Sequence, residues 1–155
     1  MAKAPTLWKK GRGALGPLDP LLGRWHASAE SPMGPMSCTR EFSRLGSKGH
    51  IQLVADWAHS KFNYREVAIY SSGDDQKLRF WSFTSDGKRS EGALADATDI
   101  HPEAVGFEAQ MPAGLARMAY WPDADVGFHF VVEARNKSGW KRFLSHHYKP
   151  APASK

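Results

Sequence analysis

Short stretches in which apolar and polar residues alternate follow one another along most of the chain. Clusters of Gly, Pro, Asp, Asn and Ser separate them, and the Asp86-Gly87 pair between two such stretches is a strong hairpin signal. The expected strands are residues 24–30, 36–45, 49–57, 63–71, 77–84, 89–94, 104–111, 115–121, 126–135 and 140–148. Their short, even spacing, without a long helical pattern, predicts an all-β protein: an antiparallel up-and-down meander of about ten strands closed into a barrel.

The residues before the first strand form two segments of different character. Residues 1–17 combine basic residues with several glycines, and we expect them to form a flexible basic arm. The next few residues predict a compact helical turn, in which Asp19 caps the N-terminus and Pro20 occupies the first helical position. We therefore expect a single barrel domain over residues 18–150 and a short tail over residues 151–155.

The last predicted hairpin can be placed in register from its loop, Asn136 to Gly139. This register sets Glu133 opposite Arg142, and His129 opposite His146. The more apolar face turns inward, and it carries Phe128, Phe130, Val132, Phe143, Ser145 and His147. The two imidazoles that face each other then lie outside, where no third metal ligand is apparent, so we expect no metal site.

A polar cluster is expected inside the barrel from the middle strands. Taking residues 72–75 as a loop pairs Arg65 with Ser82, and a two-residue turn at Asp86-Gly87 sets Glu91 opposite Ser82. The apolar residues on the same inner face are Val67, Ile69 and Phe80. The outer face carries Tyr64, Glu66, Arg79 and Trp81.

Two interpretations of this cluster remain open. Arg65 and Glu91 form a structural ion pair, or an open cavity keeps both hydrated and the arginine binds the carboxylate of a ligand. Arg40, on the same strand face as Cys38 and Phe42, is a second candidate of this kind. His147 is in turn a candidate for a ligand hydrogen bond or for a satisfied core histidine.

The composition is that of a globular protein rich in aromatic residues. Hydrophobic residues make up 41% and charged residues 24% of the 155 residues, enough for one domain with a core or a small cavity. Aromatic residues reach 12%, with six Trp. Such side chains fill barrel interiors and also line ligand cavities.

The net charge of +5 does not indicate a nucleic-acid partner. Much of the excess lies near the termini, and within the predicted barrel basic residues mix with acidic ones without forming a stripe. The single cysteine, Cys38, rules out an internal disulfide framework, and we expect a buried free thiol. No secretory signal and no membrane-spanning run are visible, so we expect a cytoplasmic protein.

The sequence Gly23-Arg24-Trp25, after a short helical turn and at the start of the first strand, resembles the opening motif of the calycins. This superfamily includes the lipocalins, the fatty-acid-binding proteins and bacterial relatives. The resemblance implies that Trp25 closes the bottom of the barrel and that a basic residue of the last strand packs across it. Arg142 is the candidate, or Lys141 if the strand is turned over.

The middle of the chain extends the resemblance. It contains Val67-Ala68-Ile69-Tyr70, a polar turn, Lys77-Leu78-Arg79-Phe80-Trp81, Ser85-Asp86-Gly87 and Glu91-Gly92. This arrangement resembles a bacterial family of short calycin-like barrels of unknown function, and its layout is similar to that of nitrobindin-like barrels. Nitrobindins bind haem through a histidine near the C-terminal end, and His146 and His147 lie in a comparable region. We predict no cofactor and keep haem as an alternative.

We therefore predict a small barrel that binds an apolar or amphipathic small molecule in its interior, and we assign no catalytic residue. The candidates for lining the cavity are Trp25, Arg65, Val67, Ile69, Phe80, Ser82, Glu91, Phe128, Phe130, Phe143 and His147. An enzyme that uses interior Glu, His and Arg side chains, an isomerase, cyclase or hydrolase, is the main alternative. An interaction module that uses the basic arm or an outer aromatic patch around Tyr64 and Trp81 is another. The sequence leaves the ligand and the oligomeric state open.

Overall fold

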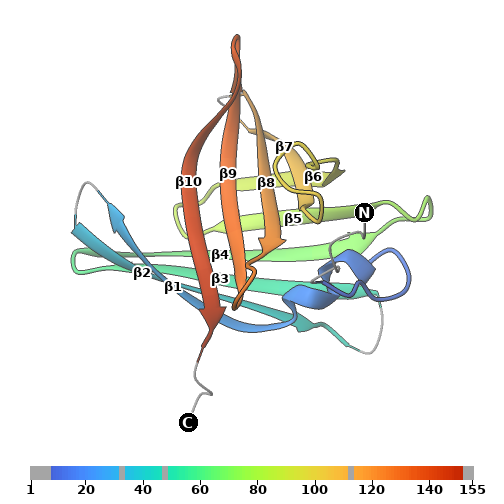
Figure 1. The fold of residues 1–155 in the computed structure, drawn as a ribbon, viewed down its shortest axis with the longest axis horizontal. Coiled ribbons are helices and arrows are strands. Elements are labelled where there is room, and N and C mark those ends of the chain that lie inside the picture. The colour runs from blue at the N-terminus through green and yellow to red at the C-terminus, as the bar shows by residue number, and fades with distance from the viewer. Residues whose placement is uncertain (1–7, 32–33, 47–48, 112–113, 152–155) are drawn as a thin grey trace.

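The computed structural model describes residues 8–31, 34–46, 49–111 and 114–151. Ten antiparallel strands follow one another around a closed barrel, in which the last strand pairs with the first (Figure 1). They are β1 (Gly23–Ser31), β2 (Gly34–Arg44), β3 (His50–His59), β4 (Phe62–Ser72), β5 (Leu78–Thr84), β6 (Arg89–Ala95), β7 (Val105–Met111), β8 (Gly114–Pro122), β9 (Phe128–Asn136) and β10 (Gly139–Pro150). The predicted all-β meander and barrel are confirmed, and each strand boundary lies within two residues of the predicted one.

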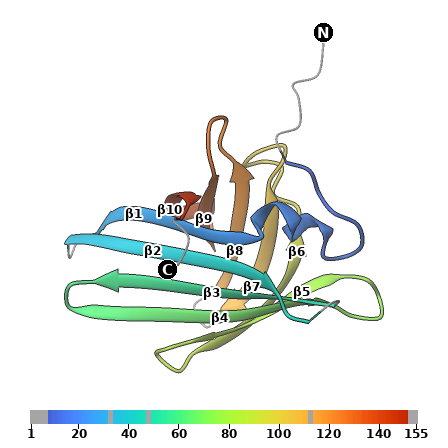
Figure 2. The ribbon, with the colours of Figure 1, turned by 90° about the horizontal axis from the view of Figure 1, so that it is seen from below.

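A short 3-10 helix, Gly16–Leu21, covers one end of the barrel. Figure 2 shows this segment, in blue, beside the start of β1. Leu18 and Leu21 are fully buried there, and the Nε1–H of Trp25 donates to the carbonyl of Leu21 at 2.7 Å. The Trp25 ring meets the Phe128 ring edge-on, with centroids 4.8 Å apart. This end is therefore closed by the helix and by aromatic side chains.

The segment predicted as a flexible arm contacts the barrel where the structure describes it. The backbone N–H of Trp8 donates to Glu103 at 3.0 Å, and its ring contacts Phe128. Residues 1–7 of that arm and residues 152–155 of the predicted tail lie outside the described residues. Among the described residues, no helix is long and apolar enough to cross a membrane.

The helix also begins earlier than predicted, and Asp19 does not cap it. The residue before the helix, Leu15, makes no side-chain cap, and Asp19 lies inside the helix. Its carboxylate instead accepts a hydrogen bond from Arg44 Nη2 at 2.8 Å. Two prolines start and interrupt this segment, and each lacks the N–H that a regular α-helix uses, so the helix stays a short 3-10 turn.

The predicted register of β4 and β5 is wrong by three positions. The strands extend to Ser72, which pairs with Leu78, and five residues form the loop between them. Gln76 adopts a left-handed conformation there, with φ of 61°, which closes the longer loop. Because an odd shift reverses the faces of a strand, the side chains of Arg65, Val67 and Ile69 point outward, while those of Tyr64, Glu66, Ala68 and Tyr70 point inward.

The turn between β5 and β6 is one residue longer than predicted. The N–H of Thr84 donates to the carbonyl of Lys88, so the loop contains Ser85, Asp86 and Gly87. Gly87 has φ of 84°, as expected for the glycine that ends a three-residue hairpin loop. Ser82 therefore pairs with Ser90, and Glu91 lies exposed on the outer face beside Trp81.

A β-bulge in β10 makes the register of the last hairpin differ from the predicted one. Glu133 pairs with Arg142 as predicted, but the register shifts between Arg142 and Leu144, and Phe143 is the extra residue. Beyond the bulge His147 pairs with His129 on the outer face, and His146 turns inward. The predictions that His146 faces His129 and that His147 points inward are therefore wrong. Phe143 itself is 63% exposed rather than buried.

A second, smaller core lies on the outside of the barrel. Its buried members are Ala97, from the loop between β6 and β7, Ala119 of β8 and Val131 of β9. An ion-pair cluster borders this outer core. Glu133 accepts hydrogen bonds from Arg117 Nε at 2.8 Å and from Arg142 Nε at 3.0 Å.

The ion-pair cluster of Glu133 extends to the loop between β6 and β7, where Asp99 binds Arg117 at 2.8 Å. Arg142 therefore lies on the outer face, with its guanidinium 5.8 Å from the Trp121 ring. The prediction that Arg142 packs across Trp25 is wrong, because Arg142 binds Glu133 on the outer face, whereas Trp25 contacts Leu21 and Phe128 at the closed end. The alternative candidate, Lys141, is exposed and pairs with Ala134.

We expect Arg117→Met to destabilise the fold, because it leaves the buried Glu133 carboxylate without its closer cation. The free energy of unfolding should fall by about 3 kcal/mol, at the low end for a broken buried ion pair, since Arg142 remains. Urea unfolding followed by circular dichroism measures this loss. The matched control is Arg65→Met, which breaks an exposed pair with Asp56 and should cause a much smaller loss. Equal losses would contradict the structural role of the outer cluster.

Candidate functional site

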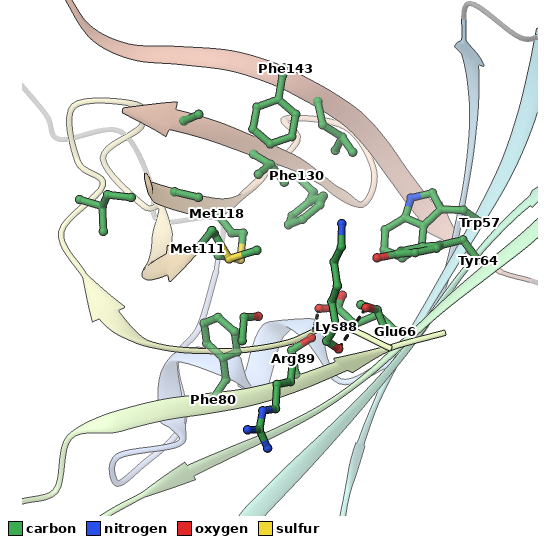
Figure 3. Close-up of a pocket in the computed structure, with 18 of the residues that line it drawn as sticks. Trp57, Tyr64, Glu66, Phe80, Lys88, Arg89, Met111, Met118, Phe130 and Phe143 are labelled. Carbon is green, nitrogen blue, oxygen red and sulfur yellow. Dashed lines mark hydrogen bonds between the residues drawn. The ribbon is translucent and has the colours of Figure 1, made fainter. Parts of the chain in front are cut away.

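The half of the barrel away from the 3-10 helix encloses a cavity of about 570 Å³. Ligand pockets in proteins commonly measure about 300–1,000 Å³, so this space suits a small organic molecule. Its walls are mainly apolar, and side chains from several strands converge on it (Figure 3). They include Trp57, Tyr64, Phe80, Met118, Phe130 and Val132.

The cavity exists because inward side chains become smaller along β8 and β9. From the closed end of β9, the inward residues are Phe128, Phe130, Val132 and Ala134. Along β8 the corresponding order is Tyr120, Met118, Ala116 and Gly114. A barrel of ten strands is wider than one of eight strands, whose interior side chains just fill it. Small residues at one end of such a barrel therefore leave open space.

Arg40 of β2 lies at the inner end of this cavity. Its side chain is almost fully buried, and the residue is 2% exposed. The guanidinium Nη2 donates to the hydroxyl of Tyr120 at 2.8 Å, and its carbon atom lies 4.1 Å from the centroid of the Phe130 ring. Two further rings, those of Trp57 and Tyr148, lie within 6 Å. An aromatic cage therefore surrounds a buried cation.

The hydrogen bonds of this guanidinium are incomplete. Arg40 Nε and Nη1 are buried and have no hydrogen-bond partner among the residues that the structure describes. The Nε1–H of Trp57, another residue of the cavity wall, is also buried without a hydrogen-bond partner among the described residues. A guanidinium has five N–H donors, and native proteins rarely leave such buried donors unpaired. The inner end of the cavity thus offers donors to an acceptor.

Glu66 is the acidic partner of this site. Its Oε1 lies 3.9 Å from Arg40 Nη2, and its Oε2 accepts a hydrogen bond from the hydroxyl of Ser82 at 2.5 Å. Burial alone would lower the pKa of Arg40, but Tyr120, Tyr148 and Glu66 outweigh it and hold that pKa above its usual value. The guanidinium is therefore charged at any physiological pH.

The tyrosines beside Arg40 remain neutral donors and acceptors. Burial raises the pKa of Tyr70 and that of Tyr120 above their usual values, although Arg40 acts in the opposite direction on both. Burial also lowers the pKa of His146, and the nearby Arg40 cation lowers it further. The remaining ionisable groups at the inner end are Arg40 and Glu66, and the cavity wall also includes the exposed Lys88, Arg89 and Arg135.

Some of the predicted cavity residues line the cavity. Phe80, Ser82, Phe130 and Phe143 are among its wall residues, and so is Arg40. Phe143 reaches it from the mouth, where the bulge places its exposed ring (Figure 3).

The other predicted residues lie elsewhere. Trp25 and Phe128 belong to the filled end of the barrel. Arg65, Val67, Ile69, Glu91 and His147 lie on the outer face, for the register reasons given above. Arg65 there pairs with Asp56 at 2.7 Å instead of with Glu91. The predicted Arg65–Ser82–Glu91 cluster does not form, and Arg40, Ser82 and Glu66 form the polar cluster of the interior.

The sequence analysis missed Trp57, Tyr64, Glu66 and Met118 as wall residues. Tyr64 and Glu66 were placed outside by the three-position error in the loop after β4. The decreasing size of the alternate residues on β8 and β9 was a usable signal for the position of the cavity. None of the seven histidines is among the described residues that line it, so the histidine ligand that the haem alternative implies is not found there.

We expect Cys38 to be unreactive in the folded protein. The residue is fully buried, and burial raises the pKa of its thiol to about 11, although Arg40 and Tyr148 lower it in part. At pH 8 on the order of one thiol in a thousand is then ionised, and only the thiolate reacts. Ellman's reagent should therefore react at least about 100-fold more slowly with the native protein than with protein in guanidinium chloride. Equal rates would contradict the burial of this thiol.

Comparison with known proteins adds no relative to this picture: no protein-family model matches the chain, and no curated protein matches it.

Proposed function

We propose that the protein binds an amphipathic small molecule with one anionic group, such as a carboxylate, inside the open half of the barrel. The observation that carries the proposal is Arg40: a buried cation with two unpaired nitrogen donors at the inner end of an apolar cavity. The anionic group would meet this guanidinium, and the apolar body of the ligand would extend toward the mouth.

The unpaired donors favour a ligand over an empty cavity. A buried donor without a partner costs about 1–3 kcal/mol, and more when it is charged. An acceptor at Arg40 Nε or Nη1 removes this cost, and a hydrogen bond between charged groups is stronger than a neutral one. The same contact would favour an anionic ligand, since a neutral acceptor such as a hydroxyl oxygen makes a weaker hydrogen bond to the guanidinium than a carboxylate does.

The apolar walls supply most of the remaining affinity. Each 100 Å² of apolar ligand surface removed from water contributes about 2.5 kcal/mol before the costs of association are subtracted. The rings of Trp57, Phe130 and Phe80 present flat apolar surface to the cavity, and Met118 adds a flexible thioether. These walls suit a hydrocarbon chain or an aromatic body.

Glu66 limits the charge of the ligand. Its carboxylate lies 3.9 Å from Arg40, so the two groups together carry no net charge. A second acidic group beside Arg40 would meet Glu66, and repulsion in a buried site is strong. We therefore infer that the inner end accepts one acidic group, while Lys88, Arg89 and Arg135 supply positive charge at the exposed part of the wall.

The architecture also supports the proposed relationship to the calycins. A ten-strand meander is closed at one end by Trp25 and a short helix and is open at the other end. This is the arrangement that the resemblance of Gly23-Arg24-Trp25 implies, and the proposed ligand would occupy the cup that it forms.

We expect the protein to prefer decanoate over decanol, because the two share one hydrocarbon chain and differ in the anionic group. Displacement of the fluorescent probe 8-anilinonaphthalene-1-sulfonate measures both affinities. The preference for the anion should be about 10-fold or more, and Arg40→Met should abolish it. The control is Arg65→Met, which removes an outer arginine and should leave the preference unchanged.

Arg40→Met also has a cost in stability, which must be separated from its effect on binding. It leaves the Glu66 carboxylate without its nearest cation, so we expect a lower melting temperature without ligand, and the binding comparison uses the folded variant. If the wild type shows no preference for decanoate, or if folded Arg40→Met keeps that preference, the proposal is wrong.

We expect Ala116→Phe to block the cavity. Ala116 lies on the cavity wall, and a phenyl ring there would occupy the space of the ligand body. The variant should lose affinity for decanoate and for decanol alike, by about 10-fold or more. The matched control is Ala124→Phe, at an exposed position of the loop between β8 and β9, far from the cavity. Unchanged binding by folded Ala116→Phe would place the ligand elsewhere.

A further inference from the structure

Three potential metal ligands meet on the outer face of the barrel, away from the cavity. His129 of β9 and His147 of β10 are directly paired across two neighbouring strands, and Asp123 begins the loop between β8 and β9 (Figure 1). One ligand atom from each of the three residues lies within 4.8 Å of the other two. All three side chains are partly exposed, so an ion can reach them from solvent.

We propose that Asp123, His129 and His147 form a binding site for a divalent transition-metal ion of the zinc class. The carboxylate Oδ1 of Asp123 lies 2.7 Å from His129 Nε2 and 3.8 Å from His147 Nε2. In a tetrahedral zinc site with bonds of about 2.0–2.1 Å, neighbouring ligand atoms are about 3.3–3.4 Å apart. The two distances bracket this value, so shifts of roughly half an ångström bring the carboxylate to the spacing of a coordination site. The ligand atoms of the two histidines lie within 4.8 Å of each other.

The carboxylate is held in the orientation that such a site needs. Asp123 Oδ2 accepts hydrogen bonds from the backbone N–H groups of Asp125 at 2.9 Å and Val126 at 3.2 Å. These contacts leave Oδ1 facing the two histidines. Hydrogen bonds that orient a ligand from behind are typical of metal sites, because they reduce the loss of freedom on binding.

The two imidazole rings are also held in place. They stack on each other, with centroids 4.6 Å apart and an angle of 22° between their planes. The other side of the pair is covered by Trp121, whose ring stacks on His129 at 5.4 Å. The rings therefore present their nitrogens at the same edge, beside Asp123. Stacking already limits the rotation of both rings before a metal binds.

Metal binding changes the hydrogen bonds of both histidines. Without metal, Nε2 of His147 lies 2.8 Å from the carbonyl oxygen of Val126 and donates to it, and Nε2 of His129 donates to Asp123. On binding, each of these Nε2 atoms gives its lone pair to the metal, and the proton moves through solvent to Nδ1 of the same ring. The loss of two hydrogen bonds makes this a weaker, exchangeable site than a closed four-ligand one.

The ligand set selects the class of ion. Imidazole nitrogen suits Zn²⁺, Ni²⁺ and Cu²⁺, whereas Mg²⁺ and Ca²⁺ bind mostly to oxygen. Three protein ligands leave at least one coordination position for water or a further group. The same three side chains also serve as a hydrogen-bond cluster that holds the loop, and the experiment below distinguishes that purely structural role from metal binding.

The test is isothermal titration calorimetry, in which ZnCl₂ is added to the full, untagged chain after treatment with a chelator. We expect one equivalent of Zn²⁺ to bind, and no binding of MgCl₂ under the same conditions. His129→Ala and His147→Ala should each weaken Zn²⁺ binding by at least about 10-fold, since even the loss of a supporting residue commonly costs that much. His50→Ala is the matched control, because His50 lies exposed on β3 and binds Ser71 instead.

A second variant keeps the test independent of the folding of the loop. Asp123→Asn retains an oxygen acceptor for the two backbone N–H groups but removes the charge that binds the metal. Because it loses the acceptor for His129, its melting temperature without metal should fall slightly, and it should still lose at least about 10-fold in Zn²⁺ affinity. The proposal is overturned if Zn²⁺ does not bind at one equivalent, or if the His129, His147 and Asp123 variants bind it as well as His50→Ala does. Arg40→Met should bind Zn²⁺ normally, because the cavity and this site are separate.

Discussion

The width of a ten-strand barrel is the constraint on which the rest of the structure depends. Side chains can fill a barrel of eight strands, but ten strands leave space unless nearly every strand contributes a large residue. Here that condition holds at one end only, where a set of aromatic rings lies beneath Leu18 and Leu21. Toward the other end the alternate residues become small, and the interior stays open. The cavity follows from strand number and side-chain size together.

Arg40 lies at the boundary between the filled and the open half, and its position explains its chemistry. The aromatic rings of the filled half surround its guanidinium and compensate part of the cost of burying a cation. Hydrogen bonds to Tyr120 and the proximity of Glu66 compensate a further part, and two nitrogens remain unpaired. These two nitrogens are the basis of the proposed binding role.

The sequence was sufficient to predict the positions of the strands, but not which face of each strand points into the barrel. Turn residues such as Gly87 mark where strands end, and all ten strands follow from them. The side-chain period of a strand is two, so any odd error in a loop reverses its faces. A left-handed Gln76 and the bulge at Phe143 have no distinctive sequence signal, and each moved residues to the wrong side. Arg40 was correctly placed as an interior candidate because its strand contains neither irregularity.

The wall around the cavity is unequal in stiffness. Along β8 and β9 it is two layers thick, since the loop carrying Ala97 and Asp99 lies over it and the Arg117–Glu133 pair fastens the strands from outside. Along β5 the wall is one layer thick, and the outer side chains of Trp81 and Phe83 are exposed. Local opening takes place where few buried contacts must break. The barrel wall would therefore yield first along the β5–β6 hairpin and last along β8 and β9, where the outer layer holds it.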